Sequence, residues 1–138
     1  MSIPPFHLAF PVQSIKSTRR FYVEILGCDV GREDERWIDF NFFGHQITAH
    51  LAEDESKNYN QVDNRAVPTR HFGAILAWED WHQLVKRVRS YHIEFYIEPY
   101  TRFKDQVGEQ RTFFIQDPSQ NYLEFKSFRD SQYIFISH

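Results

Sequence analysis

Two histidines and a glutamate, far apart in the sequence, lie in similar short segments and could bind one metal ion. His7 is part of HLAF, His71 begins HFGAIL and Glu124 is part of NYLEF. Side chains alternate between the two faces of a β-strand, so each segment has an apolar face and places its polar residue on the other. His50, in QITAHL, follows the same rule and is a fourth candidate ligand.

Glu124 is the most informative of these residues because it stands between Leu123 and Phe125. A carboxylate in apolar surroundings normally neutralises, pairs with a cation or binds a metal. Imidazoles together with one carboxylate and open coordination positions suit Fe(II), and also Zn, Ni, Mn or Co. The pattern therefore predicts a divalent metal site, with Fe(II) as the first candidate, in which the ion keeps Glu124 ionised.

The elements that must position these residues form two copies of one pattern. In the first copy, FHLAFPV is a predicted strand, SIKSTRRFYVEILG is a helix ending at Gly27, and a turn at Gly44-His45 joins the strands WIDFNFF and QITAHL. In the second copy, RHFGAILA is a strand, WEDWHQLVKRVRSY is a helix, and IEFYIEP, RTFFIQ and NYLEFKSF are strands. The order is βαβββ twice, in a register that matches His7 with His71 and His50 with Glu124.

These repeats predict an α+β fold in which two βαβββ modules form a cupped mixed β-sheet with the helices outside. We expect one domain over residues 1–138. Its parts are module one at 5–52, a polar linker at 53–69, module two at 70–128 and a C-terminal tail at 129–138. In such a cup the polar faces of the strands would meet, which would bring the candidate ligands around one point.

The composition argues against several kinds of function. The chain has 138 residues, a net charge of −3 and scattered basic residues, so nothing favours nucleic acid as a partner. Its single cysteine, Cys28, cannot form an internal disulfide, and we interpret it as a small buried residue. No signal peptide and no apolar run of about 20 residues is visible, so we expect a soluble cytoplasmic protein that does not enter a membrane.

The sequence resembles the vicinal oxygen chelate superfamily, which includes glyoxalase I, extradiol ring-cleaving dioxygenases, fosfomycin-resistance transferases and bleomycin-binding proteins. The similarity rests on HLAFPV with RFYVEILGC, on RHFGAIL and on FFIQDPSQNYLEFKSF, and it covers roughly residues 5 to 130. WIDFNFFGHQITAHL, VPTRHFGAIL and FKDQVGEQRTFFIQ are most similar to a bacterial subgroup described as predicted extradiol dioxygenases. The resemblance implies the glyoxalase/bleomycin resistance/dihydroxybiphenyl dioxygenase fold.

The same resemblance implies a set of metal ligands. His7, His71 and Glu124 match the metal ligands of the family by position. His50 stands where glyoxalase I-like members have a fourth ligand and where extradiol dioxygenases typically have none. Gln120 replaces the glycine that usually precedes the last strand, which changes the chemistry of the turn and leaves the ligand spacing intact.

The chemistry shared by the family is chelation of two neighbouring substrate oxygens by the metal, which acts as a Lewis acid. The resemblance therefore predicts an extradiol-dioxygenase-like oxidoreductase that acts on a small, catechol-like substrate, with His50 and Tyr100 as candidate acid–base residues. Arg102 and Arg111, on or beside a long loop, could bind an anionic substrate, and Tyr122 shares the face of Glu124. Further candidates are His45 and Tyr96 for proton transfer and Lys104 for binding an anion.

Two other functions stay open at this point. A four-ligand site that includes His50 would favour a glyoxalase-like lyase or isomerase. A non-catalytic binder of the resistance type would need no metal chemistry, although retention of both histidines and the glutamate counts against it. A homodimer is expected in each case, because paired modules can close a cup within one chain or swap between two chains.

Overall fold

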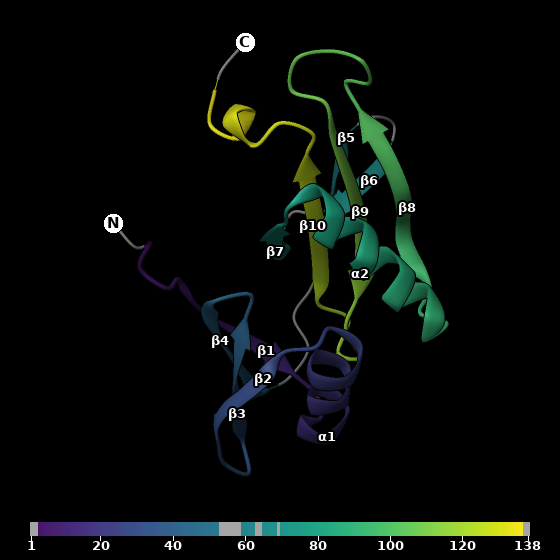
Figure 1. The fold of residues 1–138 in the computed structure, drawn as a ribbon. Coiled ribbons are helices and arrows are strands. Elements are labelled where there is room, and N and C mark those ends of the chain that lie inside the picture. The colour runs from purple at the N-terminus through teal and green to yellow at the C-terminus, as the bar shows by residue number, and fades with distance from the viewer. Residues whose placement is uncertain (1–2, 53–58, 63–64, 69, 137–138) are drawn as a thin grey trace. The chain divides into compact units, whose positions relative to one another are not determined.

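The structure is a computed structural model that describes residues 3–52, 59–62, 65–68 and 70–136 (Figure 1). The chain divides into two compact units. The first comprises residues Met1–Ser56 with Asp117–Asn121, and the second comprises Lys57–Gln116 with Tyr122–His138. Each unit holds one four-stranded mixed sheet and one main helical segment, which confirms the predicted α+β class with paired modules.

The sheet of the first unit has the strand order β1-β4-β3-β2. Strand β1 runs parallel to β4, whereas β3 is antiparallel to both β4 and β2. The strands are β1 (His7–Val12), β2 (Asp29–Glu33), β3 (Trp37–Phe42) and β4 (His45–Leu51). The predicted turn at Gly44-His45 lies one residue earlier, at Phe43 and Gly44, because both of these residues have positive φ, of 52° and 91°.

One helical segment covers a face of this sheet. It begins as α1 (Ile15–Arg19), where the Ser14 side chain accepts a hydrogen bond from the Ser17 amide, and continues as the π-helical turn η1 (Arg20–Ile25). Tyr22 is fully buried and stacks on Phe40, with 4.9 Å between ring centroids. Gly27, at φ 79°, follows the end of the helix as predicted.

The sheet of the second unit has the strand order β7-β10-β9-β8, with β7 parallel to β10 and the other pairs antiparallel. Helix α2 (Trp78–Ser90) covers one face, and the Trp81 indole Nε1 donates to the Phe125 carbonyl at 2.8 Å. The opposite face is therefore the one that carries Glu124. The strands are β7 (Phe72–Ile75), β8 (Phe95–Arg102), β9 (Gln110–Gln116) and β10 (Tyr122–Phe128).

The predicted linker at 53–69 contains secondary structure that the sequence pattern did not indicate. Strands β5 (Tyr59–Val62) and β6 (Arg65–Pro68) pair as an antiparallel hairpin. Residues 53–58, 63–64 and 69 of the same stretch lie outside the described residues. The tail after β10 contains one short 3-10 turn, η2 (Ser131–Tyr133). No helix in the part of the chain that the structure describes has the length and apolar character needed to cross a membrane.

Candidate metal centre

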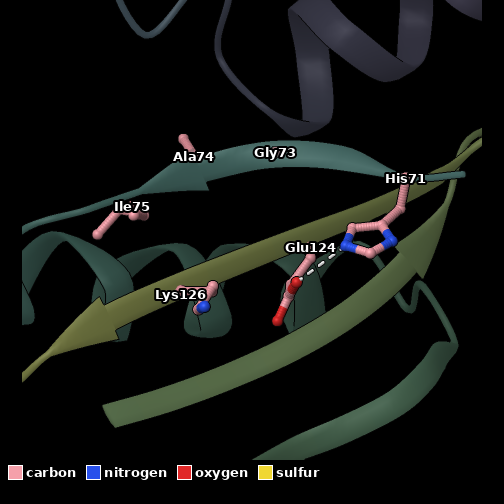
Figure 2. Close-up of a pocket in the computed structure, with 6 residues that line it drawn as sticks. All are labelled: His71, Gly73, Ala74, Ile75, Glu124 and Lys126. Carbon is pink, nitrogen blue, oxygen red and sulfur yellow. Dashed lines mark ion pairs between the residues drawn. The ribbon is translucent and has the colours of Figure 1, made fainter. Parts of the chain in front are cut away.

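His71 and Glu124 lie side by side in the second unit (Figure 2). The Nε2 atom of His71 is 3.2 Å from Oε1 of Glu124, and the two side chains are 29% and 17% exposed. Both line an open pocket together with Gly73, Ala74, Ile75 and Lys126. The pairing predicted from strand alternation is therefore present for these two residues.

Gly73 explains how β7 comes so close to Glu124. The parallel ladder places Gly73 opposite Glu124. A Cβ atom at residue 73 would lie 1.5 Å from the Glu124 carbonyl oxygen, which no real contact allows. Only a residue without a side chain fits here, and this close approach sets the position of His71, two residues earlier, relative to Glu124.

Two further contacts fix the orientation of the pair. The Nδ1 atom of His71 is 2.8 Å from the Pro68 carbonyl, so Nδ1 carries the proton and donates, which leaves Nε2 facing Glu124. The Thr112 hydroxyl donates to the second oxygen of Glu124, Oε2, at 2.6 Å. Metal-binding histidines and carboxylates usually have outer partners of this kind.

The electrostatics of the pair favour a charged carboxylate. Burial raises the pKa of Glu124, but hydrogen bonds from His71 and Thr112 and the charge of Lys126 outweigh burial and lower the pKa overall. The hydrogen bond to Glu124 raises the pKa of His71, against an opposing effect of burial. A positive charge is thus favoured next to Glu124, whether from a protonated His71 or from another cation.

The pair also has the spacing that a shared metal ion requires. Two ligand atoms at about 2.1 Å from one ion, at angles between octahedral and tetrahedral values, lie about 3.0–3.4 Å apart. The observed 3.2 Å falls inside this range. An imidazole nitrogen and a carboxylate oxygen suit a first-row divalent ion, so the residues present fit the metal that the sequence predicts.

The strand pairing aligns the two repeats differently from the sequence prediction, which matched His50 with Glu124. Leu8 pairs with Ile47 and Phe72 with Leu123, in each case one residue after the candidate histidine. One step further, Ala9 pairs with Thr48 and Gly73 with Glu124. The residue that corresponds to Glu124 is therefore Thr48.

His50 is distant from His7 within the same sheet. His7 is opposite Gln46 and His50 is opposite Pro11, four positions along the ladder. Four residues of strand span about 13 Å, so the structure does not bring these two histidines together. Both are exposed on the face that the helix leaves uncovered.

Thr48 has a carboxylate partner of its own. Its hydroxyl donates to Asp39 Oδ1 at 2.6 Å, across the β3–β4 ladder. Within each unit, no three His, Cys, Asp or Glu side chains of the described residues gather as a metal-binding group. His71 and Glu124 are therefore two potential ligands rather than a complete group.

The predicted substrate-binding residues fall on two faces. Tyr100 pairs with Thr112 and Arg102 with Gln110, which places Tyr100 and Arg102 on the Glu124 face. Tyr122 precedes Glu124 by two residues on that face, and its ring contacts Tyr96 at 4.9 Å. Arg111 is different, because it follows the alternation to the helix-covered face.

Arg111 stacks over the Trp81 ring, 4.9 Å from its centroid, and its Nη1 contacts His82 Nε2 at 3.1 Å. The sequence interpretation of Arg111 as a residue of the Glu124 site is therefore corrected. The two further proton-transfer candidates have other partners. His45 Nδ1 accepts a hydrogen bond from the Phe6 amide, and the Tyr96 hydroxyl donates to the Ala66 carbonyl.

Three contributors to the pair, Gly73, Thr112 and Pro68, were not singled out from the sequence. Alternation in RTFFIQ places Thr112 on the face opposite Phe113, so Thr112 could have been found from the pattern. Pro68 could not, because it lies in a hairpin inside the predicted linker.

Comparison with known proteins supports the resemblance seen in the sequence. Residues 5–125 match the family model described as "Glyoxalase/Bleomycin resistance protein/Dioxygenase superfamily". The comparison with curated proteins finds no match. The solved structures include a glyoxalase/bleomycin resistance protein/dioxygenase from Alicyclobacillus acidocaldarius, 32% identical, with a TM-score of 0.82 and 96% of each chain covered.

Two more distant structures share the fold. The fosfomycin resistance protein FosX from Listeria monocytogenes is 15% identical, with a TM-score of 0.70 and coverage of 92% of this chain and 94% of that one. A lactoylglutathione lyase from Agrobacterium tumefaciens is 11% identical, with a TM-score of 0.63 and coverage of 90% and 92%.

Proposed function

The chain belongs to the glyoxalase/bleomycin resistance protein/dioxygenase superfamily, and on this basis we propose that it is a divalent-metal-dependent enzyme. In this proposal His7, His71 and Glu124 bind the metal. The observation that supports it is the His71–Glu124 pair, whose ligand atoms lie 3.2 Å apart with outer partners on both residues. His7 is added because it stands at the start of β1, as His71 stands just before β7, and by the family resemblance.

Fe(II) is the proposed metal, because two histidines and one carboxylate with open positions form the triad of non-haem Fe(II) oxygenases. When bound, the ion would act as a Lewis acid toward two neighbouring substrate oxygens and as a binding site for O₂. The proposed reaction is ring cleavage beside a catechol-like diol. Both atoms of O₂ enter the product, so the reaction needs no external reductant.

The chain's own residues would prepare this site in separate ways. Pro68 and Thr112 hold His71 and Glu124 in one orientation. Tyr122 is buried against Tyr96, whose half-buried ring could contact a planar substrate on the same face. Tyr100, opposite Thr112 in the ladder, is the proposed acid–base residue of the second unit.

The register of the first unit favours this reaction over that of a four-ligand lyase or isomerase. Thr48 occupies the place that corresponds to Glu124, and His50 lies about 13 Å along the ladder from His7. We therefore leave His50 out of the metal set and keep it as a candidate acid–base residue. The lyase or isomerase remains the second candidate function, and an equal loss of metal in His50→Ala and His71→Ala would favour it.

The direct test combines metal analysis with oxygen uptake. The untagged protein, purified anaerobically and loaded with Fe(II), should contain about one metal per chain. It should also consume O₂ with at least one member of a catechol panel. His71→Ala should lose the metal and the uptake, whereas His92→Asn, at an exposed histidine after α2, should keep both. Failure to bind Fe, Mn, Ni or Zn would leave a non-catalytic binder instead.

We also propose a cytoplasmic homodimer. The described tail exposes two large apolar side chains, Phe135 at 96% and Ile136 at 48%, which would gain from burial between chains. Light scattering after size-exclusion chromatography should give twice the 16.7 kDa chain mass. A monomer at micromolar concentration would contradict the dimer without affecting the metal site.

A further inference from the structure

Lys126 lies in the same pocket as His71 and Glu124 (Figure 2). It follows Glu124 by two residues on β10, so both side chains leave the same face of the strand, with about 7 Å between their Cα atoms. The ladders pair Lys126 with Ile75 on one side and Thr112 on the other, and pair Thr112 with Tyr100. We call these four residues the Lys126 row.

Lys126 forms no ion pair of its own in the described part of the chain, although its charge lies close enough to Glu124 to lower the pKa of that carboxyl group. The ring that its ammonium group faces is Phe128, 5.6 Å from Nζ. Glu124, the nearest carboxylate along the strand, is already bound by His71 and Thr112. A half-buried ammonium that shares its nearest carboxylate with two other donors can bind a further negative charge favourably.

A metal ion at His71 and Glu124 makes this imbalance larger. Two positive centres within one pocket repel each other, and the repulsion is strong where water is partly excluded. An anionic group bound at Lys126 would reduce it. The positive charge of Lys126 is therefore consistent with a ligand that brings its own negative charge beyond the chelating oxygens.

The other residues of the Lys126 row would also suit an anionic ligand with an apolar body. At one end Ile75 is 46% exposed and offers an apolar contact. At the other end the Arg65 guanidinium stacks over the Tyr100 ring, 3.8 Å from its centroid, and adds a second positive charge in the same unit. Carboxylates bind best to such cationic groups when the rest of the ligand is held by apolar contacts.

We propose that the substrate is an aromatic diol that carries a carboxylate, and that Lys126 binds this carboxylate. The inference rests on the proposed function, because the diol oxygens are assigned to the metal. The spacing of two residues along β10 suits a ligand whose carboxylate and diol lie on opposite sides of one ring. Lys126 is then a specificity-determining residue and makes no contact with the reacting oxygens.

The test compares two probes that differ in the carboxylate alone, 3,4-dihydroxybenzoate and catechol. Calorimetry on anaerobic, Fe(II)-loaded protein gives a dissociation constant for each without turnover. We expect the wild type to bind dihydroxybenzoate about tenfold or more tightly than catechol, as a charge-assisted hydrogen bond would give. In Lys126→Met the ratio should fall to near one, with catechol affinity changed by less than about twofold. Lys126→Arg should keep most of the preference.

Lys86→Met is the matched control, because Lys86 is an exposed lysine on α2, which covers the other face of the sheet. It should bind both probes as the wild type does. Lys126→Gln serves as a second neutral variant if Lys126→Met does not fold. Equal affinity of the wild type for the two probes, or an unchanged preference in both neutral variants, would overturn the inference.

The outcome separates this inference from the proposed reaction. A carboxylate preference that disappears in Lys126→Met supports the inference even if no probe consumes O₂, in which case the dioxygenase proposal fails alone. Oxygen uptake with catechol at the same KM in wild type and Lys126→Met, without any preference for dihydroxybenzoate, supports the reaction and rejects the role of Lys126.

Discussion

Strands β4 and β10 occupy corresponding places in the two units, and one of the positions at which they differ is decisive for the site. Where β10 has Glu124, β4 has Thr48. Both units pair a threonine with a carboxylate on the uncovered face, yet in opposite order. In the first unit Thr48 on β4 donates to Asp39 on β3, and in the second Thr112 on β9 donates to Glu124 on β10.

This exchange gives the two repeats different chemistry from the same architecture. A carboxylate on β10 lies next to the histidine before β7, so the second unit presents two potential metal ligands. The carboxylate on β3 of the first unit is hydrogen-bonded by Thr48 and Gln46 instead. The second unit thus pairs its carboxylate with a histidine, the first does not, and the comparison can be tested one residue at a time.

Exchange of the carboxylate for an amide should have the largest effect. Glu124→Gln should weaken divalent metal binding by more than about 100-fold, because the loss of a ligand exceeds the loss of an outer partner. Asp39→Asn, the corresponding change in the first unit, should keep the metal. Metal content after dialysis, measured by mass spectrometry, distinguishes the two, and equal losses would mean that the first unit also supplies a carboxylate.

Of the two threonines, the one in the second unit should matter more for metal affinity. Thr112→Val removes the hydroxyl that holds Glu124 Oε2, which should reduce metal affinity by about 10- to 100-fold. Thr48→Val should leave metal affinity unchanged and lower the free energy of unfolding by about 1 kcal/mol through the lost hydrogen bond to Asp39. Competition with a metal-binding dye gives the affinities, and a Thr48→Val effect on them would contradict the assignment.

The glycines of the two sheets provide a stability comparison. Gly73→Ala would force β7 and β10 apart, because its Cβ would overlap the Glu124 carbonyl, and should lower the free energy of unfolding by about 1–3 kcal/mol or more. A Cβ at Gly31 in β2 would have its nearest contact with Asp39 Cβ, at 3.4 Å, an ordinary van der Waals distance. Gly31→Ala should therefore cost much less in urea unfolding. Equal costs would show that the close approach at Gly73 relaxes easily.

A glycine in the turn before β10 should stabilise the protein. Gln120 has φ 66°, in the left-handed region that disfavours side chains, and it is exposed. Gln120→Gly should raise the free energy of unfolding by up to about 1 kcal/mol. Thermal unfolding of the metal-free protein measures this, and a lower melting temperature would mean that the Gln120 side chain contributes more than its backbone costs.

The smallest expected effect is the pH dependence of stability that Asp117 contributes in the first unit. Burial raises the pKa of Asp117, although hydrogen bonds from Asn121, Tyr22 and Ser119 oppose the rise. A carboxyl group with a raised folded-state pKa contributes stability that is fully present below its unfolded pKa and is lost as pH rises through the folded value. The stability advantage of wild type over Asp117→Asn should therefore shrink from about pH 4 upward. Urea midpoints at several pH values would show it, and a growing advantage would reverse the sign.

The pair of His71 and Glu124 could be anticipated from the sequence because strand alternation needs only local information. Phe72 follows His71, Leu123 and Phe125 flank Glu124, and the structure places both polar side chains on the face opposite the helix. Tyr100 and Tyr122 follow the same rule. Periodicity thus identified the face of the site in the second unit.

Register could not be obtained in the same way. The sequence pattern matches Glu124 with His50, but the turns that precede their two strands differ in length. Strands β3 and β4 are joined by two residues, whereas five residues, 117–121, join β9 and β10. Arg111 was misjudged for a related reason, because β9 begins at Gln110 and its alternation, rather than a loop, decides where the guanidinium points.

The five residues 117–121 belong to the first unit, although both strands that they connect belong to the second. Asp117 accepts from the Tyr22 hydroxyl, and Asn121 donates to the Pro11 carbonyl. A gene split between the repeats would consequently yield a first polypeptide that lacks residues 117–121 of its own unit, whereas the second would contain all of its unit. The first half should therefore be insoluble when produced alone and should be rescued by co-expression with the second half.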